Sequence, residues 1–200
     1  EPLAALGLNL LTGYNGQISV GHGAFFGVGA YTTAILVTDH GWSHYATLGA
    51  AALIAFALGV LVGLPALRLK HLYLAIATLS FQMIFQWTIN FLPMFNQGQT
   101  IPIGRVFWFT GEVSRKHHYF FWYYVTLTVV VVFGLAVRNL LRSRYGRALV
   151  AVRDNDRAAD AMGMHPGLTK VYAFALAGFF AGVAGGLHAY LYRGAGLESF

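Results

Sequence analysis

Long apolar runs separated by short polar links are the main pattern of this sequence. Five stretches, each at least 21 residues long, contain no Asp, Glu, Lys or Arg. They are residues 2–38, 40–67, 71–104, 117–137 and 171–192. Because a helix needs about 20 apolar residues to cross a bilayer, the pattern predicts a membrane protein with several helical spans.

Turn-forming residues divide these runs into the expected elements. Gly13-Tyr14-Asn15-Gly16 ends a short apolar piece, and residues 93–119 form a polar, irregular loop. Helices are expected over residues 19–37, 45–67, 72–92, 120–137 and 171–192. The prediction is an all-α polytopic membrane protein, one permease-like domain over residues 1–200 with about five to six transmembrane or re-entrant helices. We also expect the natural chain to be longer.

The helix expected over residues 19–37 is rich in glycine, with glycines at 21, 23, 27 and 29. Each weakens a helix by about 1 kcal/mol relative to alanine. Gly23 and Gly27 have the GxxxG spacing that lets a second backbone approach closely in lipid. Two interpretations stay open: a broken or re-entrant segment that lines a protein cavity, and an ordinary, tightly packed span.

Two other helices carry patterned faces. Gly59 and Gly63 in one, and Gly178, Gly182 and Gly186 in another, predict close helix packing. Helix 72–92 places the amides Gln82, Gln86 and Asn90 on one face, which should turn toward protein or a water-filled path. These amides serve either as interhelical hydrogen-bond partners or as contacts for a polar substrate.

Composition excludes several classes of function. Charged residues make up 10% of the chain, against about a quarter in soluble domains. Without cysteine, the chain has no disulfide, zinc–thiolate site or thiol redox centre. The sequence contains no GxxxxGK[ST] motif, so we expect no ATPase site in this chain. The excess positive charge lies beside membrane spans and does not indicate a nucleic-acid partner.

One long charged stretch, residues 138–170, lies between two expected spans. It holds seven of the thirteen Lys and Arg residues and three of the seven acids. Since basic loops favour the cytoplasmic side, this stretch and the Arg68–Lys70 link should be cytoplasmic. The outer links would then be residues 39–44, 93–119 and 193–200.

A short helix is expected within this charged stretch. Polar residues at 154–156 can cap its start, and residues 157–162 are alanine-rich. Gly163 suits a left-handed stop, and Pro166 prevents continuation. A helix with such small side chains fits a groove on a partner protein. The alternative is an amphipathic helix that lies on the membrane surface.

Four blocks of the sequence carry a family resemblance. They are GYNGQISVGHGAFFGVGAYTTAILV from Gly13, LRLKHLYLAIATLSF from Leu67, SRYGRALVAVRDNDRAADAMGM from Ser143 and KVYAFALAGFFAGVAGGLHAY from Lys170. They resemble segments of branched-chain amino-acid ABC transporter permeases of the LivM type, in the family's order. Residues 93–119 are the least distinctive part. Urea and short-amide permeases are close relatives, so the resemblance specifies the family more closely than the substrate.

The resemblance implies a transport subunit of an ABC importer in the inner (plasma) membrane, with no catalytic residue, metal or cofactor of its own. It implies ABC ATPase subunits, which hold ATP and Mg, a second, LivH-like permease subunit, and a periplasmic or lipoprotein substrate-binding protein. Membrane lipid surrounds the assembly. Residues 138–170 would contain the coupling helix that docks on the ATPase and transmits its movement to the spans.

For this coupling role we select Arg147, Arg153, Asp154, Asn155, Ala158, Ala159 and Gly163. The two alanines and the glycine fit the family's EAA-type pattern, although Arg157 stands where the pattern expects an acid. We expect the arginines at 147 and 153 to contact acids of the ATPase or lipid phosphates. Ordinary surface charge is the alternative.

For the substrate pathway we select Gln17, Ser19, Gly21, His22, Gly23, Phe26, Gly27, Gln82 and Gln86. Broken backbone there would leave N–H and C=O groups for the carboxylate and ammonium of a zwitterion. A histidine within a span, such as His22 or His188, is a functional candidate. One interhelical hydrogen bond would satisfy it equally.

Two other classes stay open. A membrane haem or redox protein would use His22, His71 and His188 as ligands, although His71 lies at a basic membrane edge. A channel or carrier that works without ATP usually needs a carboxylate within a span, and no expected span contains one.

Overall fold

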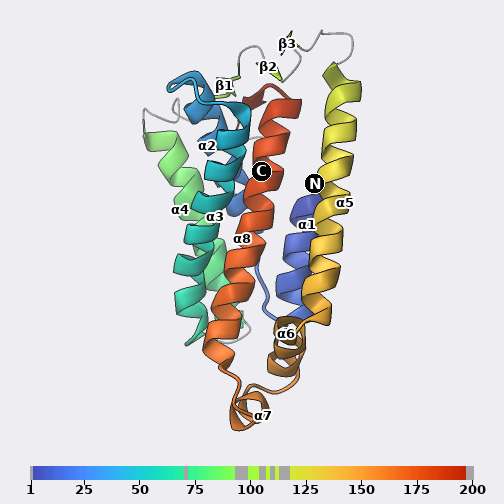
Figure 1. Ribbon diagram of the computed structural model, residues 1–200. Coiled ribbons are helices and arrows are strands. Elements are labelled where there is room, and N and C mark those ends of the chain that lie inside the picture. The colour runs from blue at the N-terminus through green and yellow to red at the C-terminus, as the bar shows by residue number, and fades with distance from the viewer. Residues whose placement is uncertain are drawn as a thin grey trace.

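The chain forms a bundle of helices that stand side by side along one axis (Figure 1). The structure is a computed structural model that describes residues 2–69, 72–92, 99–103, 107–108, 111–112 and 118–196. Its helices are α1 (Pro2–Asn9), the π-helical η1 (Leu10–Tyr14), α2 (His22–Thr38), α3 (His44–Ala66), α4 (Leu72–Phe91), α5 (His118–Arg142), α6 (Arg144–Asp154), α7 (Asp156–Ala161) and α8 (Pro166–Leu191). Its short strands are β1 (Ile101–Pro102), β2 (Phe107–Trp108), β3 (Gly111–Glu112) and β4 (Gly194–Ala195).

Four helices of the described chain are long and apolar enough to cross a membrane, namely α3, α4, α8 and the part of α5 from Phe120 to Arg142. The 17 residues of α2 measure about 25 Å at 1.5 Å per residue, somewhat less than a hydrocarbon core of about 30 Å. The predicted class, an all-α polytopic membrane protein, is confirmed. Helices α1 and α2 are both shorter than these four helices.

Helix α8 is the central element. Its most apolar window is 72% buried, compared with 17% for α4 and 11% for α5, which flank the bundle. A Cβ added to Gly59 on α3 would lie only 2.6 Å from the carbonyl oxygen of Phe174 on α8. One added to Gly178 would lie 2.5 Å from that of Ala55. The close packing predicted from the glycines of these two helices is therefore confirmed.

The two ends of the bundle differ. At one end β1 pairs with β4 in an antiparallel ladder, and Thr38 Oγ1 donates to the carbonyl oxygen of Pro102 over 3.3 Å. Helices α6 and α7 lie at the opposite end (Figure 1). Leu69, which follows α3, lines a cavity there together with Arg153 of α6. The two basic links therefore share one end, as the charge pattern predicts.

Some predicted features fall where the structure describes nothing. Lys70, His71, residues 93–98 and residues 197–200 lie outside the described residues, as do several positions between 104 and 117. The predicted outer loop is described only in part.

The charged stretch departs from the prediction in three ways. Helix α5 continues to Arg142 instead of ending at 137. Helix α6, absent from the prediction, follows it, and the Ser143 hydroxyl caps α6 by accepting from the Tyr145 N–H. Pro166 begins α8, because the fixed φ and missing N–H of proline suit the first helical position.

Candidate functional site

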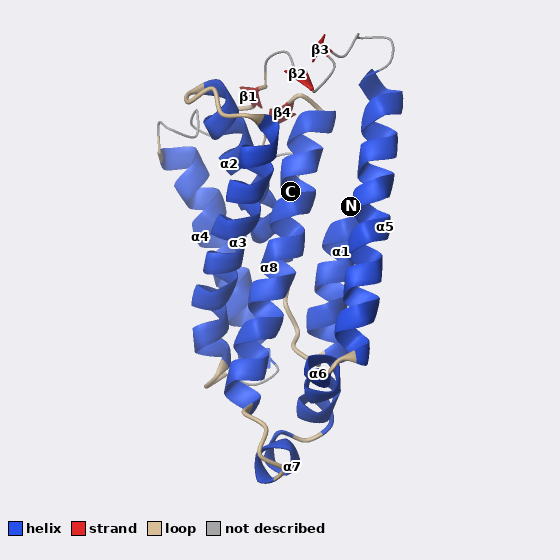
Figure 2. Cartoon of the chain, viewed as in Figure 1, coloured by secondary structure: helices blue, strands red, loops and turns tan. Residues whose placement is uncertain are grey.

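The chain is not helical between η1 and α2. Residues 15–21, here called the broken segment, connect the two as a thread within the bundle (Figure 2). Asn15, Gln17 and Ser19 in this segment are 3%, 5% and 9% exposed. In a membrane, non-helical backbone is tolerated where protein or a water-filled cavity shields it. Of the two interpretations of residues 19–37, the broken one holds as far as Gly21, and a continuous helix follows.

Both ends of the broken segment are anchored. The Gln17 N–H donates to the carbonyl oxygen of Leu11 in η1 over 3.1 Å. The Val20 N–H donates to Thr78 Oγ1 on α4, also over 3.1 Å. At Gly21 the backbone approaches α4 so closely that an added Cβ would overlap the Thr78 carbonyl oxygen. The path of the segment is thus set by main-chain contacts on both sides.

Buried polar atoms without hydrogen-bond partners gather around the broken segment. Within the described residues they include both amide atoms of Asn15, Gln17 Oε1, Ser19 Oγ and Gln82 Oε1. An unpaired buried polar atom costs about 1–3 kcal/mol. Such groups in a native protein call for a specific explanation, such as a functional role or a bound water. Their concentration here makes the broken segment the candidate pathway site.

The structure brings only part of the predicted pathway set together. Gly21 and Gly23 face α4, where the Gln82 amide would lie 3.4 Å from a Cβ added to Gly23. Gln86 is half-buried one turn further along α4. Asn90 is exposed and its amide donates to the Gln86 carbonyl oxygen over 3.0 Å. The third amide therefore does not turn inward as expected.

The other members of the pathway set point elsewhere. His22 Nε2 lies 3.0 Å from the carbonyl oxygen of Ala4 on α1, the interhelical hydrogen bond considered for it. The Phe26 ring packs against His188 of α8, with ring centroids 5.2 Å apart. Gly27 is buried within α2. These residues contribute to helix packing rather than to the surface of the broken segment.

Helix α6 connects the charged stretch, residues 138–170, to the broken segment. This stretch is called the loop below. Its inward face carries the buried residues Leu149 and Val152. Near its end, Arg153 Nη1 donates to the Gly13 carbonyl oxygen over 2.9 Å, and the same guanidinium pairs with Asp154. Arg153, selected for contact with acids of the ATPase or lipid phosphates, holds the turn before the broken segment of its own chain, and 43% of its side chain stays exposed.

Helix α7 is capped as the sequence predicts, one residue earlier than expected. Asn155 Oδ1 accepts from the N–H groups of Arg157 and Ala158, over 3.0 and 3.2 Å. Gly163, with φ of +80°, follows the helix in the left-handed conformation. The Asn cap favours the start of the helix at this position, and the glycine stop favours its end.

Of the residues selected for coupling, Ala158 and Ala159 lie in α7 and differ in burial. Ala158, Ala161 and Met162 are exposed, the last by 66%. Ala159 is fully buried and packs inside the loop, so it offers no surface to a partner. Arg147, on α6, is exposed, and its guanidinium donates to a carbonyl oxygen of its own chain.

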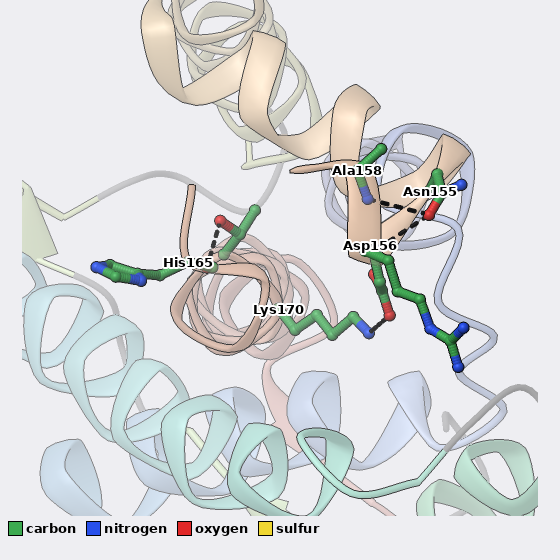
Figure 3. Close-up of polar contacts among 7 residues, drawn as sticks. Asn155, Asp156, Ala158, His165 and Lys170 are labelled. Carbon is green, nitrogen blue, oxygen red and sulfur yellow. Dashed lines mark hydrogen bonds and ion pairs between the residues drawn. The ribbon is translucent and has the colours of Figure 1, made fainter. Parts of the chain in front are cut away.

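An ion pair joins α7 to the core of the bundle. The Lys170 ammonium on α8 pairs with the Asp156 carboxylate at the start of α7 (Figure 3). The Lys170 side chain is only 16% exposed. Neither of these residues, nor Gly13, belongs to the sites predicted from the sequence. An ion pair between residues of two different helices produces no periodic pattern in the sequence. A hydrogen bond from an arginine to a backbone carbonyl cannot be predicted from residue types, because every residue has such a carbonyl.

A cavity of about 370 Å³ separates the broken segment from the loop. Asn15, Gly16 and Gln17 line one side, and Lys170 lines the side of α8. The loop contributes Arg153, Asp154, Asn155, Asp156 and Arg157. One pathway candidate, Gln17, and three of the seven coupling candidates, Arg153, Asp154 and Asn155, therefore line the same polar cavity.

No group of three His, Asp or Glu side chains that suits a metal ion occurs within the described ranges. Of the histidines considered as haem ligands, His22 contacts α1 and His188 contacts the rings of Phe26 and Tyr192. His71 lies outside the described part.

Known proteins resemble this chain over most of its length. Residues 2–200 match the family described as branched-chain amino acid transport system / permease component. The chain is 32% identical over 211 residues to the high-affinity branched-chain amino acid transport system permease protein LivM of Escherichia coli (strain K12). It is 32% identical over 209 residues to the protein of that name in Salmonella typhimurium (strain LT2).

Each alignment covers 94% of this chain and 49% of the relative, so the chain spans about half the length of these relatives. No solved structure matches the chain significantly. The family match and the four apolar helices identify a multi-pass protein of the inner membrane. This chain belongs to the family of branched-chain amino acid transport permease components.

Proposed function

We propose that this chain is the transmembrane permease subunit of an ABC importer for branched-chain or other hydrophobic amino acids. The observation that carries the proposal is the bond from Arg153 to the Gly13 carbonyl oxygen, which joins the loop to the broken segment. One chain thus combines a polar break within an apolar bundle and a loop connected to it. A subunit that transports a zwitterion in response to movement of a partner protein requires both a polar segment within the membrane and a loop that is connected to it.

The partners follow from this role. The proposed assembly contains ABC ATPase subunits with ATP and Mg, a second, LivH-like permease subunit, and an extracytoplasmic binding protein. Residues 138–170 then face the cytoplasm, which agrees with their positive charge. In this proposal the chain is a transport subunit and not an enzyme, and holds no cofactor of its own.

Two internal bonds would transmit movement from the ATPase. The exposed face of α7 around Ala158 and Met162 seats in a groove of the ATPase. The pair between Asp156 and Lys170 passes a displacement of α7 to the central helix α8. The bond from Arg153 passes a displacement of α6 to the broken segment. Packed helices respond to such displacements as rigid bodies.

The chemistry of the broken segment suits a zwitterion with an apolar side chain. The unpaired Asn15 amide nitrogen supplies donors for a carboxylate, and the unpaired amide oxygens of Asn15, Gln17 and Gln82 supply acceptors for an ammonium. Surrounding helices supply apolar surface. The same amides suit urea or a short amide, which is the second candidate substrate class.

The test is reconstitution of the full-length protein with the ATPases, second permease and binding protein encoded beside it. Uptake of labelled leucine into proteoliposomes should require ATP and the binding protein, and excess isoleucine should compete. Uptake of urea in place of leucine would establish the second substrate class. Leucine uptake at an undiminished rate without ATP would overturn the importer and indicate a carrier.

A further inference from the structure

A basic hollow of about 490 Å³ lies between α6 and the start of α8. Arg144 and Arg147 of α6 and His165 before α8 line it, and all three side chains are exposed. No acidic side chain of the described residues lines this hollow. The salt bridges found in the described part involve Arg153 and Lys170. The charge of the hollow is therefore not neutralised by carboxylates of the described chain.

An apolar groove of about 250 Å³ continues from this hollow into the bundle. It is lined by side chains from α3, α5, α6 and α8, including Phe56, Leu140, Leu149 and Leu176. The two spaces share walls formed by Tyr145, Ala148, Thr169 and Tyr172. From Leu168 to Leu176 the combined groove extends about 12 Å along α8, at 1.5 Å per residue.

Two helix N-termini reinforce the positive charge. Helix α6 begins at Arg144, and α8 begins at Pro166 directly after His165. The side chain of His165 makes no capping hydrogen bond to α8. The N-terminal end of a helix carries partial positive charge and unpaired N–H groups, which attract anions.

We propose that this groove binds one anionic phospholipid, with the phosphate in the basic hollow and an acyl chain in the apolar groove. Charge complementarity selects this occupant. A phosphodiester with an apolar tail matches a positive mouth that leads into an apolar channel between membrane helices. A zwitterionic lipid gains less from the arginines, because its ammonium group is repelled by them, and a free anion gains nothing from the groove. A lipid in this groove would contact α6 and three membrane helices. The lipid proposal does not depend on the proposed transport function.

Native mass spectrometry of the full-length protein assembly tests the proposal, with phosphatidylglycerol and phosphatidylcholine of identical acyl chains as probes. Phosphatidylglycerol should bind more tightly. The double change Arg144→Gln/Arg147→Gln should weaken its binding by about fivefold per arginine. The matched control is Arg153→Gln/Arg157→Gln, which removes the same charge from the same loop at the other cavity. It should leave lipid binding unchanged.

A second variant tests the apolar part. Ala148→Phe places a ring where the hollow and groove meet, and should weaken phosphatidylglycerol binding while the arginines remain. Equal binding of both lipids, or equal losses in both double variants, would overturn the proposal. Binding of glycerol phosphate as tight as that of the intact lipid would identify an anion site instead. An ATPase cross-linked into the hollow through a probe at position 148 would identify a protein interface.

Discussion

The Arg153 guanidinium donates a 2.9 Å hydrogen bond to the carbonyl oxygen of Gly13, a residue 140 positions earlier in the chain. The side chain also runs along Gly16, where an added Cβ would lie 2.6 Å from Arg153 Cγ. Gly16 has φ of +69°, a conformation that favours glycine. One side chain of the loop therefore contacts the turn on which the broken segment depends.

Arg153→Ala should uncouple ATP hydrolysis from transport. Losing a charged hydrogen bond costs about 1.5–3 kcal/mol, so leucine uptake per ATP should fall by about tenfold or more while hydrolysis persists. The measurement is the ratio of uptake to phosphate release in proteoliposomes. Arg157→Ala is the control, because Arg157 lines the same cavity and carries the same charge. Equal effects of the two variants would show that only loop charge matters.

Gly23→Leu should block the pathway without unfolding the bundle. A Cβ at Gly23 meets only the Gln82 amide, at 3.4 Å, so alanine fits there, whereas leucine fills the space beside Gln82. Uptake should fall by about tenfold or more, as expected when a change costs over 1.4 kcal/mol. Gly134→Leu on α5, where nothing lies within 4 Å, is the control. Normal uptake by both Gly23→Leu and Gly27→Leu would leave this region with a packing role only.

The two alanines of α7 should respond differently to glutamate. Ala158→Glu places a charge on an exposed surface, so the protein should fold normally but bind the ATPase more weakly. Ala159→Glu buries a charge, and the loop should lose roughly 3 kcal/mol or more of stability. Thermal unfolding in detergent and co-purification of the ATPase separate these outcomes. ATPase retention by a stable Ala158→Glu variant would remove α7 as the docking helix.

Gly163→Pro should disturb the same loop through its backbone. Proline fixes φ near −65°, whereas Gly163 has φ of +80°. The stop after α7 would therefore change, and coupling of ATP hydrolysis to uptake should fall. Gly163→Ala, which strains the same conformation less severely, should show a smaller loss. Unchanged coupling in the proline variant would mean that the position of α7 is immaterial.

Gly59→Leu should destabilise the contact between α3 and α8. The added side chain would meet the Phe174 carbonyl oxygen, where even a Cβ lies at 2.6 Å. Overpacking of this kind typically costs about 1–3 kcal/mol. The melting temperature in detergent should fall, whereas Gly49→Leu on the same helix, with open space around it, should melt as the wild type does.

Helix α7 shows which features can be predicted from the sequence. The Asn155 cap and the Gly163 stop act within a few residues, so local pattern predicts both, and the helix appears one residue from its expected place. The inward direction of Ala159 depends on what the loop packs against. Sequence pattern contains no such information, so it does not distinguish Ala159 from its exposed neighbour Ala158.

The sequence by itself determined the membrane class, the long helices to within a few residues of their ends except at α5 and α8, and the family. The membrane class and the helices depend on composition over about 20 residues and on local caps, which any window of the chain displays. The family follows from the resemblance of the four sequence blocks. Only the tertiary structure decided that Arg153 meets Gly13, that Lys170 meets Asp156, and that His22 and Phe26 point away from the broken segment. Such contacts join residues on different helices, and they follow from how the helices pack around α8 rather than from any local pattern.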